Sequence, residues 1–431
     1  MKTQIINLKG GAKLLFNRQT EINGICLEFT FKAGSLNDPM GKLGVAHFCE
    51  HALCDFANAK MTKKERSSYS RKFQYRNAYT SNSNMGFSIR TVDEDFEDAV
   101  DFVTESFASI KYLPEDFEEE QRIISDEIKT QLQINRRITP YITFTEVLDD
   151  KAYNNLVASP AGKMETFNKI TLDDLKEFIS KYITLNNLII SVCGNIKKSK
   201  VVSIMKKYVE ERLKVSKDYG YDKREIDFTP SKVHFAEAIE KGKSQIEITY
   251  DLKRVPFSYD FVREQSVSTI LRAILQEKTF EYFRTEHNLC YGCSNYVGVH
   301  MGHLINEVCV YCQEENMQEV IEKFDNFIST FSGDISKELF DKHKKKVIDS
   351  FNFDIEDIGS IARSMLNVYS DRRKIYNDKY KSEWQNELQK VTYEEVNEIY
   401  KMLFTVKPHI ILVASKEFEK FDFKDITVIK E

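Results

Sequence analysis

The sequence predicts an α+β protein that contains two copies of one domain. A chain of 431 residues is long for a single hydrophobic core, and two to three domains are typical of this length. A predicted helix at 170–178 and a buried strand at 188–193 recur at 391–399 and 409–414, both displaced by 221 residues (170 to 391, 188 to 409). We therefore expect each half to pack helices on one face of a largely antiparallel sheet.

A polar segment at 214–232 separates the two predicted domains. It contains Gly220 and Pro230, which are typical of turns and linkers. We expect an N-terminal domain at 1–213 and a homologous C-terminal domain at 233–431.

One short motif in the first domain carries the chemistry. His47 and His51 are four residues apart, so on a helix both imidazoles project from one face and can hold one metal ion. Glu50 lies on the same face, where it can take a proton from an attacking water. The His-x-x-Glu-His spacing inverts the commoner His-Glu-x-x-His metal motif. Taken alone, the motif is also compatible with two surface histidines on a solvated helix.

A second predicted helix, which begins at Pro114, supplies a candidate third ligand. Proline in the first turn and the acids after it favour a helix start. At about 100° per residue, Glu120 and Glu127 fall inside the apolar arc of this helix rather than on its charged side. Buried carboxylates are costly unless a cation neutralises them, and that cation is either a metal ion or a buried lysine or arginine.

These two helices resemble those of the pitrilysin family of inverted-zincin metallopeptidases, in particular its short two-domain members. The resemblance implies that Glu50 is the general base and that Glu120 orients a metal ligand. The zinc ligands that it implies are His47, His51 and Glu127. The second domain contains no His-x-x-Glu-His motif, so we expect one Zn²⁺ ion per chain.

Two further segments resemble functional parts of the same family. Asn77, Ala78 and Tyr79 resemble the edge strand to which the peptide substrate adds as one more strand, although an ordinary polar edge strand would look the same. Arg284 and Tyr291 resemble the pair that grips the substrate backbone and stabilises the oxyanion of the reaction.

The family's long members place the zinc in the first of four domains and the Arg/Tyr pair in the fourth, and the four domains form a clamshell. A two-domain chain would form half of that clamshell. We therefore expect a homodimer, or a heterodimer with a related chain, in which Arg284 and Tyr291 act on the zinc site of the other chain.

Composition and charge narrow the cellular context. Charged residues make up 30% of the chain and hydrophobic residues 42%, as in ordinary soluble proteins. The net charge of −5 argues against a nucleic-acid partner, and no apolar run approaches the length of a membrane span. The first ten residues lack the apolar core of a signal peptide, so the expected location is the cytoplasm. A basic stretch at 60–72 is expected to be a solvated face.

Four of the eight cysteines form two Cys-x-x-Cys pairs, which admit a zinc-ribbon interpretation. The pairs are Cys290 with Cys293 and Cys309 with Cys312. Both segments look like strands, in which residues three apart point to opposite faces. Reduced core or surface thiols are therefore the favoured interpretation, and a binding module with a second zinc is the alternative.

Together with the resemblance, these features predict a zinc-dependent endopeptidase that hydrolyses short or unfolded peptides inside a closed chamber. Glu50 would carry the water's proton to the leaving amine, and zinc and Tyr291 would hold the oxyanion. Three alternatives stay open: a subunit that is active only with a partner chain, a noncatalytic scaffold subunit, and a processing enzyme for one dedicated precursor peptide.

Overall fold

The computed structural model of the chain describes residues 3–131, 135–150, 155–156, 159–217, 226–255, 261–300, 302–330, 333–350, 358–370, 380–403, 405–415 and 427–430. The chain divides into two compact units, each with its own sheet and hydrophobic core. Unit 1 comprises 1–128, 158–223 and 355–378, and unit 2 comprises 129–157, 224–354 and 379–431.

The two units exchange one segment each. Segment 129–157 belongs to unit 2 and segment 355–378 belongs to unit 1. The predicted division into two domains, 1–213 and 233–431, with a linker at 214–232 stays a prediction. The two compact units are not contiguous halves of the chain, because each contains one segment from the other half.

Unit 1 is built on a six-stranded sheet. Across the sheet the strands are β1 (Gln4–Asn7), β2 (Lys13–Arg18), β8 (Leu188–Gly194), β3 (Ile25–Phe31), β5 (Met85–Thr91) and β4 (Tyr75–Thr80). Only β2 and β8 run parallel, and the other neighbours are antiparallel. The strand β4 therefore lies at one edge.

Unit 2 contains a six-stranded sheet of matching order. Its strands are β12 (Gly292–His300), β13 (His303–Gln313), β11 (Lys243–Arg254), β14 (His409–Ala414), β10 (Lys232–Glu237) and β15 (Thr427–Lys430). β14 pairs parallel with β10 and antiparallel with β11, as β8 does with β2 and β3. A second, small sheet joins β7 (Asn155–Leu156), β6 (Leu148–Asp150) and β9 (Ile226–Phe228).

The repeated helix–strand unit occupies equivalent positions in the two sheets. Helix α7 (Leu172–Tyr182) leads to β8, and helix α14 (Tyr393–Met402) leads to β14. Thr171 caps the first helix and Thr392 the second, each through a capping box. The expected fold class, two homologous α+β domains with largely antiparallel sheets, is confirmed.

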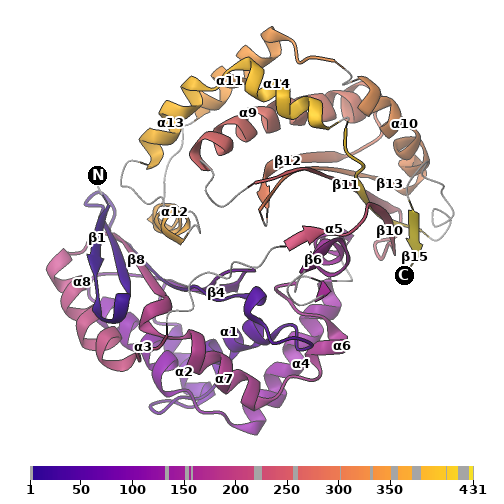
Figure 1. Cartoon of the computed structure of the whole chain (residues 1–431). Coiled ribbons are helices and arrows are strands. Elements are labelled where there is room, and N and C mark those ends of the chain that lie inside the picture. Colours follow the sequence, from indigo (N-terminus) through magenta and orange to yellow (C-terminus); the bar gives the residue numbers. More distant parts are fainter. Residues whose placement is uncertain are drawn as a thin grey trace. The chain divides into compact units, whose positions relative to one another are not determined.

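Helices cover one face of each sheet, as Figure 1 shows for α9, α11, α13 and α14 of unit 2. Unit 1 contains α1 (Val45–Asp55), α2 (Lys63–Ser70), α3 (Phe96–Ser109), α6 (Met164–Phe167), α8 (Lys198–Met205) and most of α4 (Pro114–Gln131) besides α7. Unit 2 contains α9 (Phe261–Phe280), α10 (Met317–Thr330), α11 (Lys337–Ser350) and α13 (Tyr380–Lys390) besides α14. No described helix has the length and apolar character that a membrane crossing requires.

One helix lies on the opposite face of each sheet, which the sequence did not predict. Helix α12 (Ile358–Ser370) packs Ala362 and Leu366 against β2, β3 and β8 in unit 1. Helix α5 (Asn135–Ile142) packs Ile138 against β14 in unit 2. Central strands such as β3 are consequently buried on both faces, and apolar side chains on either face stabilise the unit.

Candidate metal centre

The metal motif lies on α1, and a carboxylate fixes the start of this helix. The oxygens of Asp38 accept hydrogen bonds from the backbone N–H groups of Gly44 and Ala46, each at 2.7 Å. Gly44 has a φ of 103°, a left-handed conformation that favours glycine. The carboxylate also interacts favourably with the positive end of the helix dipole.

Two arginines hold the other end of α1. Arg66 donates to the carbonyl of Leu53 at 2.8 Å and to the carbonyl of Phe56. Arg76, on β4, donates to the carbonyl of Cys54 at 3.1 Å. The last carbonyls of a helix have no partner within it, so these contacts satisfy them and fix α1 against α2 and β4.

The expectation that 60–72 is a solvated face is wrong for part of the stretch. Arg66 is 1% exposed, although several neighbours are exposed. The reason is local: Thr62 and Glu65 form a capping box that starts α2, and one turn of helix later Arg66 points into the core.

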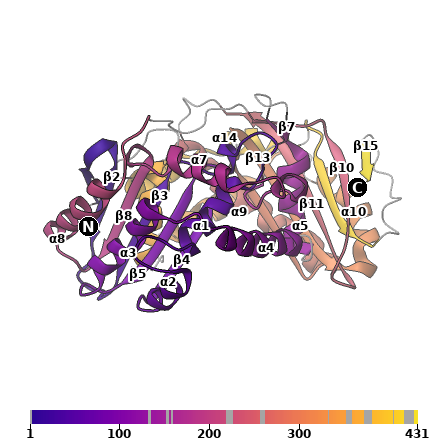
Figure 2. The same cartoon turned by 90° about the horizontal axis from the view of Figure 1, so that it is seen from below.

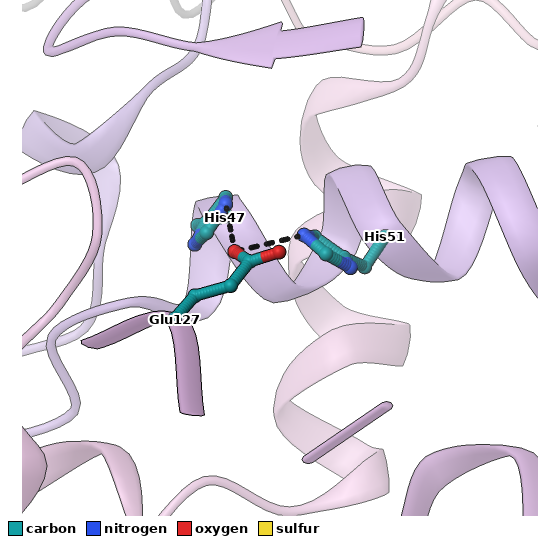
Figure 3. Close-up of side chains that lie close together, drawn as sticks. All are labelled: His47, His51 and Glu127. Atoms are coloured by element: carbon teal, nitrogen blue, oxygen red, sulfur yellow. Dashed lines mark ion pairs between the residues drawn. The ribbon is translucent and has the colours of Figure 1, made fainter. Parts of the chain in front are cut away.

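His47, His51 and Glu127 converge in unit 1 (Figure 3). Oε2 of Glu127 lies 3.7 Å from Nε2 of His47 and 3.6 Å from Nε2 of His51. One ligand atom from each residue lies within 4.8 Å of the other two. Tetrahedral zinc with bonds of about 2.0–2.1 Å separates its ligand atoms by roughly 3.3 Å, which is close to the two distances from Glu127. Figure 2 shows α1 and α4, the two helices that carry the three residues, side by side.

The electrostatics of the two histidines differ. Burial, together with the neighbouring His51, lowers the pKa of His47 to about 4, which keeps this imidazole neutral as a metal ligand must be. Burial also acts to lower the pKa of His51, but the hydrogen bond to Glu120 and the nearby carboxylate of Glu127 outweigh it and raise the pKa to about 10. In the metal-free protein, the proton on His51 therefore supplies the positive charge that a bound cation would otherwise supply. Two imidazoles and one carboxylate form a set of ligands that suits zinc.

Glu120 lies behind this cluster and orients one of its members. Oε2 of Glu120 is 3.1 Å from Nδ1 of His51, and the Glu120 side chain is only 3% exposed. Burial acts to raise the pKa of Glu120, but hydrogen bonds from His51 and Lys63 prevail and hold it below the ordinary range. Glu120 thus pairs with a lysine, as one of the two sequence interpretations expected, and also fixes the ring of His51.

Glu50 is on the same helix and is 8% exposed. Its Oε2 accepts a hydrogen bond from the hydroxyl of Thr80 at 2.7 Å. Burial raises the pKa of Glu50, and the Thr80 hydrogen bond counteracts part of that effect. A carboxylate with a raised pKa accepts a proton near neutral pH more readily than an exposed carboxylate of ordinary pKa does.

The segment with Asn77, Ala78 and Tyr79 lies in β4, the edge strand of the unit 1 sheet. Side chains alternate along it: Tyr79 is exposed, whereas Ala78 packs against the core that contains α1. The next residue, Thr80, contacts Glu50, so this edge strand runs beside the motif helix.

Arg284 and Tyr291 lie in unit 2 near the start of β12, the edge strand that corresponds to β4. The guanidinium of Arg284 donates to the carbonyl of Cys290 at 2.6 Å. The backbone N–H of Tyr291 donates to the carbonyl of Tyr311 at 3.0 Å, and the Tyr291 side chain is 49% exposed. The structure thus brings these two predicted residues together at one sheet edge.

The expectation that both Cys-x-x-Cys pairs lie within strands is wrong for the first pair. β12 begins two residues after Cys290, and the neighbouring Cys293 thiol lowers the pKa of Cys290. The second pair lies within β13, where Cys312 packs in the main core and Cys309 contacts Gln245. Within the described part of the chain, no group of three potential metal ligands includes a cysteine.

Two further groups each contain three potential metal ligands. In both groups the ligand side chains already form ion pairs or hydrogen bonds with other residues. In the group of His51, Asp55 and Glu120, Asp55 lies 3.3 Å from Arg76 and Glu120 lies 2.7 Å from Lys63. These acids therefore need no metal to balance their charge.

The other group, Asp227, Asp251 and His303, lies in unit 2. Both ring nitrogens of His303 are engaged, Nδ1 with Oδ1 of Asp251 at 2.9 Å and Nε2 with the carbonyl of Ile226 at 2.9 Å. A histidine that donates from both nitrogens has no lone pair for a metal.

Sequence reasoning missed four residues that support the site: Asp38, Lys63, Arg66 and Thr80. A capping box at Thr62 and Glu65 could have indicated a helix with an inward-facing Arg66. The contacts of Lys63 and Thr80 join residues 57 and 30 positions apart, and no local pattern carries them.

Comparisons with known proteins agree with this architecture. Residues 23–156 match the family model described as Insulinase (Peptidase family M16), and residues 169–347 match the model described as Peptidase M16 inactive domain. Zinc protease PqqE of Helicobacter pylori is 26% identical over 48% of this chain and 47% of its own length. An uncharacterized zinc protease of Bacillus subtilis, YmxG, is 21% identical over 94% of this chain and 97% of its own length.

Among solved structures, the periplasmic protease PqqL from Escherichia coli superposes with a TM-score of 0.78 at 16% identity. The match covers 96% of this chain and 48% of that protein, so this chain spans about half of it.

The chain consists of two α+β units of equivalent topology, and a helix of the first unit carries the His-x-x-Glu-His motif. This fold and site are those of an M16-type protein, and the named relatives of this chain are zinc proteases. This chain belongs to peptidase family M16, the insulinase family, and carries both its N-terminal domain and its C-terminal domain. The expected resemblance to the pitrilysin family is confirmed.

Proposed function

We propose that the chain is a zinc-dependent endopeptidase that cleaves short or unfolded peptides. The observation that carries the proposal is the convergence of His47, His51 and Glu127, with Glu50 on the same helix as the two histidines. The named zinc proteases among its relatives support the choice of metal. Among the described residues, this is the one group that combines two histidines with a carboxylate, and we assign it one Zn²⁺ ion per chain.

When bound by these three residues, zinc would supply Lewis-acid chemistry that polarises the scissile carbonyl and a water molecule. Glu50 accepts the proton of the attacking water and returns it to the leaving amine. Glu120 holds the ring of His51 through Nδ1, so that Nε2 faces Glu127. Burial of Glu50 excludes bulk water from its carboxylate and strengthens its interaction with that proton.

The substrate binds as an added strand at the free edge of β4. Its backbone pairs with Asn77, Ala78 and Tyr79, so recognition depends mainly on main-chain hydrogen bonds. Only an extended backbone can pair in this way. The proposed substrates are therefore peptides without stable structure, and folded proteins are excluded.

The chain works as a dimer in this proposal, as a homodimer or with a related chain. Arg284 and Tyr291 act on the zinc site of the other chain, where an arginine and a phenol would stabilise the oxyanion. The superposition of this chain on about half of a longer protease supports the idea of paired halves.

Complementation tests action in trans. A Glu50→Gln protein is mixed with a Tyr291→Phe protein under conditions that exchange subunits. Activity well above that of either parent is the expected result, because a mixed dimer contains one intact site. Activity no higher than that of the parents would contradict action between chains.

The cytoplasm remains the proposed location. All eight cysteines are free thiols in the structure, which is typical of proteins in a reducing compartment.

Metal removal tests the proposed reaction. The protein is stripped with a chelator and assayed on an unstructured fluorogenic peptide and on a stably folded protein that contains the same sequence. The peptide should be cleaved only after one equivalent of Zn²⁺ per chain is returned, and the folded protein should stay intact. Cleavage that survives complete metal removal would rule out the proposal.

A further inference from the structure

Thr80 connects the edge strand of unit 1 to the carboxylate of Glu50. Its hydroxyl donates to Oε2 of Glu50 at 2.7 Å. Thr80 is the last residue of β4, and its side chain points to the side of the sheet opposite to that of Tyr79. The same strand that presents a free edge therefore also contacts the proposed general base.

The contact gives the Glu50 carboxylate one defined orientation. Glu50 is buried, and within the described part of the chain Thr80 is the one residue that donates a hydrogen bond to it. A glutamate side chain has three rotatable bonds and a broad terminal torsion, so burial alone leaves its carboxylate free to rotate. A hydrogen bond to Oε2 restricts the rotation of the carboxylate, and Oε1 is the oxygen that this bond does not occupy.

The backbone of Thr80 is itself fixed before any peptide arrives. Thr80 pairs with Met85 in the β4–β5 ladder, and the turn after it is closed by a hydrogen bond from Ser81 N–H to Asn84 at 2.8 Å. Arg76, four residues earlier, ties the same strand to the C-terminal end of α1. Arg76 and Thr80 thus both join the strand to the helix, and of these two residues Thr80 is the one that contacts the general base.

We propose that Thr80 is a positioning residue that aims Glu50 from the strand to which the peptide adds. The inference rests on the proposed peptidase function and deepens it. Because the peptide pairs with the backbone of β4, the hydroxyl of Thr80 acts on the chemical step and not on peptide binding.

The test compares Thr80→Val with Thr80→Ser. Valine keeps the branched shape and suits a strand but donates no hydrogen bond, whereas serine keeps the hydroxyl. Thr80→Val should lower kcat about 10- to 100-fold and change KM by less than about threefold. The expected loss in kcat is a part of the 10²- to 10⁴-fold acceleration that a general base typically contributes. Thr80→Ser should recover kcat to within about threefold of wild type.

Thr104→Val serves as a matched control. Thr104 is a buried threonine of α3 whose hydroxyl donates to the carbonyl of Val100 at 2.7 Å, so its substitution also removes a hydroxyl contact in unit 1. This control should leave kcat within about twofold of wild type. A kcat for Thr80→Val equal to wild type, or a rise in KM with kcat unchanged, would overturn the proposal.

A second measurement needs neither metal nor activity. Thermal unfolding of the metal-free protein is followed for wild type, Thr80→Val, Glu50→Ala and the double variant. Thr80→Val should lower the midpoint by roughly 2–4 °C when Glu50 is present and by clearly less when it is absent, because the two residues are coupled. Equal shifts in both backgrounds would overturn the coupling.

The two measurements separate the inference from the function on which it rests. Zinc-loaded wild type that cleaves no peptide would overturn the proposed function, and the unfolding comparison would still decide whether Thr80 and Glu50 are coupled. Wild type that cleaves, with Thr80→Val equally fast, would overturn only the role of Thr80.

Discussion

Lys63 Nζ lies 2.7 Å from Oε1 of Glu120, and the other oxygen of the same carboxylate lies 3.1 Å from Nδ1 of His51. The two oxygens thus connect a lysine of α2 to a candidate metal ligand of α1. Lys63 compensates the charge of a glutamate that is almost completely buried, which lets Glu120 remain ionised beside His51.

Glu120→Gln should weaken zinc binding about 10- to 100-fold, because loss of a carboxylate behind a ligating histidine typically has an effect of this size. The measurement is a competition for zinc against a chromogenic chelator. Glu119→Gln is the matched control, since Glu119 also contacts Lys63, at 3.0 Å, but is 51% exposed. Equal affinities for the two variants would show that Glu120 does not support the metal site.

Arg66→Met should lower the free energy of unfolding by about 2–4 kcal/mol, because the carbonyls of Leu53 and Phe56 lose their donor in a buried setting. Urea denaturation of the metal-free protein measures the change. Arg71→Met, at the exposed C-terminal end of the same helix, should change it by less than about 0.5 kcal/mol. A small effect at position 66 would mean that α1 is held by other contacts.

The pair of His303 and Asp251 should make the stability of unit 2 depend on pH. Burial acts to lower the pKa of His303, but hydrogen bonds to Asp251 and to the carbonyl of Ile226 prevail and raise it. The pKa of His303 in the folded state is therefore above its value of about 6.5 in the unfolded chain. The stabilisation of the folded state by this pair is fully present below about pH 6.5, and it is lost as the pH rises through the folded-state pKa. The groups that face His303 are Asp251, Asp227, His300 and the carbonyl of Ile226.

Asp251→Asn should therefore destabilise the protein by about 1–2 kcal/mol at pH 6 and by less at pH 9.5, where His303 holds less of its proton. Urea denaturation at the two pH values measures the difference. Asp349→Asn, which removes an exposed partner of Lys345, should have little effect at either pH. A penalty for Asp251→Asn that is independent of pH would contradict a protonated His303.

Much of the fold follows from local patterns in the sequence. The repeat at 170–193 and 391–414 predicts the two homologous units because a capped helix followed by a buried strand has a strong local signature. The motif at His47 and His51 lies on one helix, so its spacing alone indicates a shared face.

The exchange of α5 and α12 between the halves could not be predicted in this way. Ala362 and Leu366 form an ordinary apolar stripe, and only the tertiary structure decides which sheet covers it. The same holds for the contact of Thr80 with Glu50, which depends on the register of β4 against α1. The residues around Cys290 favour a strand, but the strand begins two residues later, because local propensity does not define the end of a strand exactly.

The most direct test of the central claim measures zinc content and peptide cleavage together, in wild type and in Glu50→Gln. We expect one zinc ion per chain in both proteins and cleavage of an unstructured peptide only by wild type, because the substitution removes the base but none of the three ligands. Wild type that holds no zinc after reconstitution, or a Glu50→Gln protein that cleaves as fast as wild type, would contradict the account.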